Sequence, residues 1–399
     1  MPDLMYNSSK LAWLNTTPVQ TIFKLLSQNG GEGRIVGGAV RDYLLGVKIG
    51  DVDYCSTHTP NQVIELAKVN NIRYVESGIK YGTITLLIAG QNFEVTSLRE
   101  DVKTDGRHAV VVYGVDFVKD AMRRDFTFNA LYMSADGQIH DPLKTGIADV
   151  KQAKIKFIGN ADQRIKEDYL RILRYFRFIA RFGLNIDQTD YKQISALVGG
   201  LNQLSAERLL NEFTRIYSSE HIILALKMME DCNIFQQLFK TNLELSIVEY
   251  IKDNELEFED KWLVQLYATL PNLSVKQWVK TLKISNKQQK IVTSLKWDAG
   301  IVVLNTIQLA KLIYKNSKKI VMHNLIINAA KQNYNITKLR QKLNFVNQFN
   351  TPTFPVKGQD LLNIGFKPGA ELGTCLKTLE NLWLESQFIL TKTNLLAKV

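Results

Sequence analysis

Two aspartates near the start of the chain have the spacing of a metal site. Asp51 and Asp53 lie two residues apart in the run DVDYC, which otherwise has the composition of a β-strand. Because alternate residues of a strand face the same side, the two carboxylates would converge and repel each other. Mg²⁺ prefers a few carboxylate oxygens together with the phosphate oxygens of a substrate, so it would offset this repulsion. A solvated turn is the alternative, and it is the commoner explanation of Asp-x-Asp alone.

A pair of glycines supports the metal site. Gly37 and Gly38 follow the strand-like run RIV and precede AVRDYLLG, which has the pattern of a helix ended by Gly46. Glycines at this place let backbone N–H groups approach the phosphates of a ligand at a helix N-terminus. A tight turn explains a lone glycine pair, but the aspartates that follow favour a phosphate site. Glu94, in the strand-like run NFEVTSL, is a candidate third carboxylate, with an outward-facing strand glutamate as the alternative.

Four motifs in a fixed order carry a family resemblance. GGAVRD at 37–42, followed by DVD at 51–53, resembles the nucleotidyltransferase superfamily in its branch of poly(A) polymerases and tRNA nucleotidyltransferases. RRDFTFNAL at 123–131, EDYLR at 167–171 and SAERLLNEF at 205–213 are similar to later motifs of that branch. The bacterial class with this motif set adds CCA to the 3′ ends of tRNA. The resemblance therefore implies this activity, with CTP, ATP and the tRNA 3′ end as partners and Mg²⁺ as cofactor.

The resemblance also assigns roles at the front of the chain. Asp51 and Asp53 would hold the metal, with Glu94 as a third catalytic carboxylate. The residues that would steady the triphosphate are Gly37, Gly38, Arg41, Arg123 and Arg124. Arg41 is assigned by resemblance alone, and a structural pair with Asp42 is its alternative.

The arginines of RRDFTFNAL supply fixed positive charge. Arg123 and Arg124 suit bidentate contacts to phosphate. Asp125 and Asn129 lie four residues apart, so they share one face if the segment is helical, and they would hold the arginines or bind ribose hydroxyls. Taken alone, the motif is better explained as an ion-paired helix start. The resemblance implies that it contacts the triphosphate and the sugar.

EDYLR has the chemistry to select a base. Asp168 and Arg171 are three residues apart, so their side chains would lie together on a helix. A carboxylate accepts from an exocyclic amine and a guanidinium donates to a ring nitrogen, a pattern that cytosine and adenine share. Uracil and guanine would leave mismatched polar pairs, which supports strong discrimination. The resemblance assigns this selection to Asp168 and Arg171, and Arg174 would also contact the nucleotide; an ordinary helical ion pair is the alternative.

Residues 98–111, LREDVKTDGRHAVV, lie where the family has a flexible loop that helps the change from CTP to ATP. The segment is rich in charge, contains Gly106, and would bring Arg107 to the nucleotide. A solvated surface loop without a role is the alternative. Its presence argues against related enzymes that stop after adding CC, because their loop is shortened.

The periodicity of the chain predicts an α+β protein. Short strand-like runs alternate with helices up to about residue 150, and helical spacing dominates from there on. We predict a small mixed β-sheet head followed by an all-helical remainder. Its parts would be a catalytic head at 1–150, a helical neck with the nucleotide-selecting motif at 151–225, a helical body at 226–345 and a helical, RNA-binding tail at 346–399.

Composition favours a nucleic-acid partner and a reducing compartment. The chain has 50 basic against 39 acidic residues and a formal net charge of +11, which suits a polyanion. No apolar run reaches the roughly 18 residues of a membrane helix. Three widely spaced cysteines fit neither a disulfide framework nor a zinc site. We therefore predict a cytoplasmic protein without membrane contact, and the sequence makes no prediction of its oligomeric state.

Three alternatives to CCA addition stay open at this point. A bacterial poly(A) polymerase would use the same chemistry on a different primer, and an enzyme that adds only the final A would have almost the same motifs. A non-catalytic tRNA-binding protein with a decayed head is the alternative of a different class. The intact Asp51, Asp53 and Asp168 argue against decay, because folding alone would not retain them.

Overall fold

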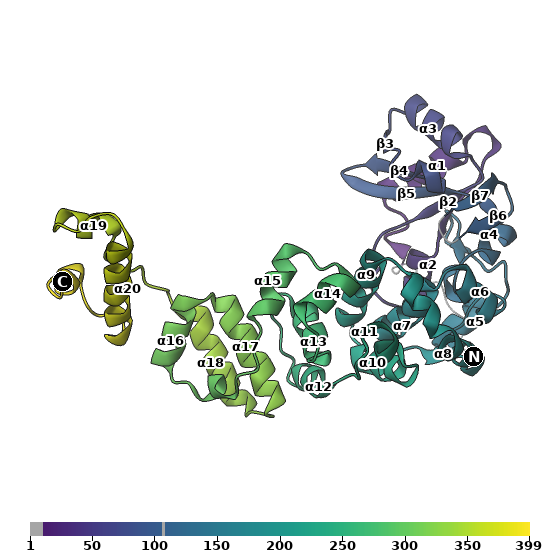
Figure 1. Ribbon diagram of the computed structural model, residues 1–399. Coiled ribbons are helices and arrows are strands. Elements are labelled where there is room, and N and C mark those ends of the chain that lie inside the picture. The colour runs from purple at the N-terminus through teal and green to yellow at the C-terminus, as the bar shows by residue number, and fades with distance from the viewer. Residues whose placement is uncertain (1–10, 106–107) are drawn as a thin grey trace. The chain divides into compact units, whose positions relative to one another are not determined.

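The computed structural model describes the backbone of residues 11–105 and 108–399, and the side chains of 11–99 and 113–399 (Figure 1). The chain forms two compact units, Met1–Lys240 and Thr241–Val399. The division into head, neck, body and tail stays a prediction.

A seven-stranded mixed sheet forms the start of the first unit, as predicted. Its strands stand in the order β3-β4-β5-β2-β1-β8-β9. They are β1 (Gly33–Val36), β2 (Tyr54–Ser56), β3 (Arg73–Val75), β4 (Thr83–Ile88), β5 (Gln91–Ser97), β8 (Tyr132–Met133) and β9 (Ile139–His140). Only the β2–β5 pair is parallel; the others in this sheet are antiparallel. Helices α1 (Thr17–Leu26) and α3 (Pro60–Val69) pack against it, with the Phe23 ring on the edge of Tyr54.

The segment that carries the two aspartates differs from the prediction. Strand β2 begins at Tyr54, so Asp51 and Asp53 precede it rather than lie in it. The carbonyl of Asp53 still accepts from the N–H of Val36 at 2.9 Å, which continues the pairing with β1 by one residue. The strand is short because aspartate disfavours the ladder, and its regular part begins where apolar residues do. Helix α2 (Gly38–Leu45) follows β1 and ends at Gly46, as predicted.

The predicted loop at 98–111 is instead most of a β-hairpin. Strand β6 (Arg99–Asp105) pairs with β7 (His108–Tyr113) in antiparallel register, with an irregularity between Asp101 and Lys103. Strand β6 could not be recognised from its sequence, REDVKTD, because strands generally avoid such charged residues. Backbone pairing across the hairpin overrides that preference. The nucleotide contact predicted for Arg107 lies outside the described residues.

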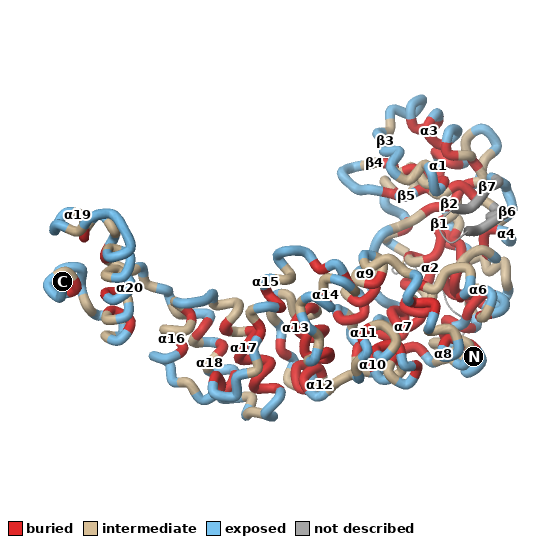
Figure 2. The backbone as a smooth tube through the Cα atoms, viewed as in Figure 1, coloured by how far each residue is buried: buried red, intermediate tan, exposed pale blue. Residues whose placement is uncertain are grey.

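Helix α7 (Leu170–Phe182) is the central element of the helical part of the first unit. Helices α6 (Ala161–Glu167), α9 (Ala206–Tyr217) and α10 (Ile222–Asp231) pack against it. The other helices of this part are α4 (Phe117–Met122), α5 (Gly146–Lys151), α8 (Gln188–Leu197) and α11 (Ile234–Phe239). A two-residue parallel pair, β10 (Lys154–Ile155) with β11 (Asn185–Ile186), interrupts the predicted all-helical region. The ring of Phe178 on α7 packs edge-on against Phe126 and Phe128, which precede β8. Figure 2 shows α7 largely buried, so the sheet region and α7 share one core.

The second unit is helical in its described residues. It contains α12 (Ser246–Asp253), α13 (Lys261–Thr269), α14 (Val275–Leu282), α15 (Asn286–Ser294), α16 (Thr306–Lys315), α17 (Lys318–Lys331), α18 (Ile336–Gln348), α19 (Gly358–Asn363), α20 (Ala370–Glu385) and α21 (Lys392–Leu396). One core gathers around α17 and another around Trp383 on α20. In the ranges that the structure describes, no helix is both long enough and apolar enough to cross a bilayer.

Candidate active site

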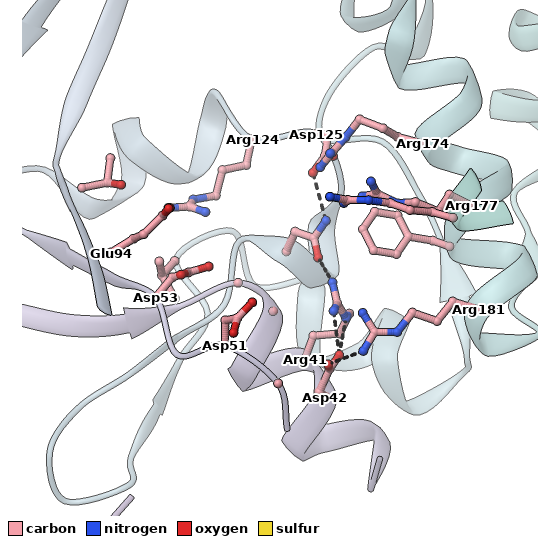
Figure 3. Close-up of a pocket in the computed structure, with 18 of the residues that line it drawn as sticks. Arg41, Asp42, Asp51, Asp53, Glu94, Arg124, Asp125, Arg174, Arg177 and Arg181 are labelled. Carbon is pink, nitrogen blue, oxygen red and sulfur yellow. Dashed lines mark hydrogen bonds and ion pairs between the residues drawn. The ribbon is translucent and has the colours of Figure 1, made fainter. Parts of the chain in front are cut away.

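Three carboxylates meet at one wall of a pocket of about 860 Å³ in the first unit (Figure 3). Asp51 and Asp53 come from the segment before β2, and Glu94 comes from β5, whose Val95 is opposite Tyr54 in the parallel pair. Burial, and then the charges of Glu94 and Asp51, raise the pKa of Asp53 to about 6. Carboxylates that repel each other in this way, beside space for a ligand, are the donor set that a divalent cation prefers.

The three carboxylates are not yet arranged as ligands of one ion. Among the described residues, no group of three or more histidine, cysteine, aspartate or glutamate side chains is placed to hold a metal. Small side-chain rotations would therefore have to accompany the binding of a cation. The chemistry of the donors fits Mg²⁺, which usually takes one or two carboxylates and completes its shell with water and phosphate oxygens.

The glycine pair brings backbone to the pocket. Gly37 has φ +70° and ψ −111°, a conformation that a side chain would strain, and its N–H donates to the carbonyl of Leu131 at 3.0 Å. Gly38 is the first residue of α2. Both line the pocket, so the N-terminus of α2 lies at its wall. Backbone N–H groups and the positive end of a helix dipole suit phosphate there.

One buried aspartate, which the sequence analysis missed, holds both arginines of RRDFTFNAL. Asp120 on α4 is fully buried and accepts from Arg123 Nε at 2.8 Å, Arg124 Nε at 3.0 Å and the hydroxyl of Tyr132 at 2.8 Å. Burial acts to raise the pKa of Asp120, but the charges of Arg124 and Arg123 outweigh it, and the net shift is downward. The available signal was an acidic residue three and four positions before two arginines, a spacing that places them together on a helix.

Asp125 and Asn129 hold arginines, but not those expected. The segment is not an α-helix; a 3₁₀ turn, η4 (Thr127–Asn129), places Asn129 Nδ2 3.0 Å from Asp125 Oδ1. The other oxygen of Asp125 accepts from Arg174 Nε at 2.7 Å and Nη2 at 2.5 Å. Burial would raise the pKa of Asp125, but Arg174 and Asn129 lower it to about 2. Asp125 therefore binds α7 to this segment rather than orienting Arg123 and Arg124.

Arg41 is occupied by protein partners. It is 4% exposed and donates from Nε at 2.8 Å and Nη2 at 2.6 Å to Asp42 Oδ1, and from Nη1 at 2.6 Å to Asn129 Oδ1. The second oxygen of Asp42 accepts from Arg181 on α7 at 2.7 Å. Figure 3 shows this chain of contacts running from Arg181 through Arg41 to Asp125. The geometry is that of the structural alternative for Arg41, and a direct contact with triphosphate stays a prediction.

The two residues of EDYLR do not lie on one helix. Asp168 is the residue after α6, with extended backbone, and its Oδ2 accepts from Arg208 Nη2 at 2.7 Å. Arg171, in the first turn of α7, donates from Nη1 to Glu167 Oε2 and to the carbonyl of Arg164, both at 2.6 Å. Spacing of three residues implied proximity only if one helix continued, and the break at Asp168 removes that condition. Both side chains nevertheless line a hollow of about 320 Å³.

Four arginines of α7, called here its basic stripe, each pair with a carboxylate: Arg171, Arg174, Arg177 and Arg181. Arg177, 8% exposed, donates from Nη1 to Glu212 Oε1 on α9 at 2.9 Å. Burial lowers the pKa of Arg177 to about 10, with Arg174 adding to that effect and Glu212 opposing it. Glu212 lies in the motif SAERLLNEF, so this motif fixes α9 against the stripe. Arg171, Arg174 and Arg181 likewise each have a carboxylate partner.

Comparisons with known proteins identify the family of this chain. Residues 33–156 match the family described as poly A polymerase head domain, and residues 183–243 match the probable RNA and SrmB-binding site of polymerase A. Mitochondrial CCA tRNA nucleotidyltransferase 1 of Mus musculus is 34% identical over 97% of this chain and 90% of its own. The CCA-adding enzyme of Streptococcus pyogenes is 30% identical over 90% of each. The Bacillus stearothermophilus CCA-adding enzyme in complex with CTP shares the fold, with a TM-score of 0.76 and 23% identity over 93% of this chain and 94% of that one. The chain belongs to the family of CCA tRNA nucleotidyltransferases.

Proposed function

We propose that this protein adds the sequence CCA to the 3′ end of tRNA from CTP and ATP, with release of pyrophosphate. The observation that carries the proposal is one pocket that joins three carboxylates, the glycine-led N-terminus of α2 and several arginines. That pocket shares Arg124, Asp125 and Arg174 with the hollow that Asp168 and Arg171 line, so triphosphate and base have adjoining places. Relatives named for CCA addition support this reaction over poly(A) synthesis.

The residues of the pocket divide the chemistry between them. The tRNA 3′ hydroxyl gives up its proton, which passes to solvent, its oxygen bonds to the α-phosphorus, and the bond from that phosphorus to the pyrophosphate oxygen breaks. Gly37 and Gly38 would receive the phosphates, with Arg123 and Arg124 beside them. Asp51 and Asp53, with Glu94, would hold Mg²⁺, which supplies charge stabilisation at the attacking and leaving oxygens.

Base selection falls to Asp168 and Arg171 in this proposal. Without a nucleotide, Asp168 is held by Arg208 and Arg171 by Glu167. A cytosine or adenine edge would satisfy a carboxylate acceptor and a guanidinium donor together, whereas a uracil edge would leave both mismatched. We expect Asp168→Ala to lower the preference for CTP over UTP by about 100-fold or more, because unpaired buried polar groups are the source of such discrimination.

An extension assay tests the proposed function. The protein is incubated with Mg²⁺ and tRNA that lacks CCA, ends in CC, or is intact, with CTP, ATP or both. Three nucleotides added to the first tRNA, one to the second and none to the third would support the proposal. Long A tracts on any RNA would establish a poly(A) polymerase, and use of ATP only on the CC-ended tRNA would establish an enzyme that adds the final A.

Asp51→Ala separates catalysis from binding. We expect it to abolish nucleotide addition while tRNA binding, measured by filter retention, persists. Retained turnover would contradict the metal assignment, and binding without turnover in the unchanged protein would favour a non-catalytic tRNA-binding protein. Exposed Glu65 offers a control, because Glu65→Gln removes the same charge away from the pocket. A cytoplasmic location is part of the proposal.

A further inference from the structure

The rim of the pocket carries an unusual pair of aromatic side chains. Among the side chains that the structure describes, the exposed aromatic ones are Tyr81, 65% exposed, and Tyr113, 38% exposed. Tyrosines are generally partly buried, and exposed aromatic rings that lie together mark interaction sites. Tyr81 lines the pocket.

The ring of Tyr113 lies against Gly82, the residue that follows Tyr81. A Cβ atom built on Gly82, which has φ +76°, would lie 3.1 Å from Cε1 of Tyr113. The Arg99 guanidinium reaches the same place: it donates to the carbonyl of Tyr81, and Arg99 is the partner of Tyr113 in the β6–β7 register. The Tyr81 N–H donates to the carbonyl of Gly78 at 2.8 Å. The rings are exposed, but the backbone beneath Tyr81 is fixed at both its polar groups.

This cluster lies at the carboxylate side of the pocket. On β5, Glu94 and Thr96 share one face, and Thr96 is opposite Thr83 on β4, with their hydroxyl oxygens 2.9 Å apart. Tyr81 comes two residues before Thr83, and both line the pocket together with Glu94 and Thr96. Figure 3 shows Glu94 near Asp53 and Arg124, with Arg41 and the labelled arginines of α7 farther from it.

The direction of attack places the RNA at the same side. In an in-line displacement the attacking oxygen lies opposite the leaving pyrophosphate. If the triphosphate rests on Gly37 and Gly38, the acceptor nucleotide enters from the side of Glu94. The bases next to the reacting hydroxyl would then lie over the rim that Tyr81 and Tyr113 form.

We propose that Tyr81 and Tyr113 form a stacking platform for the last unpaired bases of the RNA acceptor, an inference that rests on the proposed function. Stacking on an aromatic ring accepts any base, because every base has a π-face. That tolerance suits an acceptor whose terminal base changes with each addition. Arg99 places fixed positive charge under the platform, where it can attract the RNA backbone.

The test compares ring removal with ring retention in the full-length protein. We expect Tyr81→Ala and Tyr113→Ala each to raise the KM for tRNA by about 5- to 100-fold, the range that alanine substitution of a stacking residue produces. The KM for CTP should not change. Tyr81→Phe and Tyr113→Phe keep the ring and should behave like the unchanged protein. Val69→Ala, which removes an exposed apolar group at the end of α3, is the surface control.

A direct readout of stacking completes the test. tRNA that lacks CCA, with 2-aminopurine as its terminal base, is titrated without nucleotide, and stacking should quench the fluorescence of that base. We expect the quench to be lost in Tyr81→Ala and kept in Tyr81→Phe. An unchanged KM for tRNA and an unchanged quench in both alanine variants would overturn the platform. Failure of the unchanged protein to extend any tRNA would instead overturn the proposed function, while the quench would still report on the platform.

Discussion

Replacing Asp53 with asparagine is expected to stabilise the metal-free protein while abolishing nucleotide addition. The ionised carboxylate is destabilised by burial and by the charges of Glu94 and Asp51, which raise its pKa from 3.8 to about 6. A shift of about two pKa units corresponds to about 3 kcal/mol between the protonated and ionised forms. Asparagine has nearly the same shape and no charge, so it removes this penalty.

The sign of the pH dependence follows from the raised pKa. The folded protein holds the proton of Asp53 up to about pH 6, whereas the unfolded chain releases it near pH 4. The native protein therefore loses stability as the pH rises from about 4 to 6, and Asp53→Asn does not. The difference between them should be near zero at about pH 4 and about 3 kcal/mol above pH 6, which is roughly 6–12 °C in melting temperature for a unit of this size.

Thermal melting of the full chain at a series of pH values measures this difference. Glu65→Gln, which removes an exposed charge paired with Lys68, is the control, and its effect should stay within about 0.5 kcal/mol. Added Mg²⁺ should raise the melting temperature of the unchanged protein more than that of Asp53→Asn, because a ligand stabilises the form that binds it. A variant that is less stable at neutral pH, or a difference that does not depend on pH, would refute the reasoning.

Three further substitutions test the contacts around the pocket. Asp125→Asn should destabilise the protein by about 2–3 kcal/mol at neutral pH, because the folded pKa of Asp125 is about 2. When the free energy of unfolding is measured at decreasing pH, the difference between variant and unchanged protein should vanish as the pH falls through that value. Asp120→Ala should lower the free energy of unfolding by about 3–5 kcal/mol in urea titrations and raise the KM for CTP, since it leaves two arginines without their buried partner. Gly200→Ala would place its Cβ 1.9 Å from the ring of Tyr169, next to Asp168, so it should cost about 1–3 kcal/mol and weaken the discrimination of CTP from UTP in single-nucleotide assays.

Local patterns predicted those parts of the site that depend on local structure. The glycine pair at the start of α2 and the aspartates before β2 line one pocket, and each could be singled out because a short motif fixes its own backbone. The prediction that Asp-Val-Asp lies in a strand was wrong, because the backbone pairing of this segment is limited to the carbonyl of Asp53. The β6 strand was missed because backbone pairing with β7, and not residue preference, stabilises it.

Residue spacing in the sequence could not predict contacts between segments that are far apart in the chain. Arg174 and Asp125 are far apart in the chain, and so are Arg181 and Asp42, yet each pair is within 2.7 Å. Only the packing of α7 against the sheet region brings them together. Asp168 pairs with Arg208 on α9, which is likewise distant in the chain, whereas Arg171 pairs locally with Glu167, four residues before it.

The charges of the pocket fall into two groups that respond differently to a substrate. The arginines of α7 are already held by carboxylates, so their positions are set before a nucleotide arrives and little rearrangement accompanies binding. At Asp53, burial and the charges of Glu94 and Asp51 outweigh the attraction of Arg124, so the ionised carboxylate is destabilised in the free protein and the site is strained. In the proposed function, a cation that arrives with a triphosphate would relieve this strain and so couple nucleotide binding to stability at one end of the pocket only. Because Asp42 and Asp125 bind α7 to the glycine and RRDFTFNAL segments, the sides proposed to bind phosphate and to select the base are held in one core.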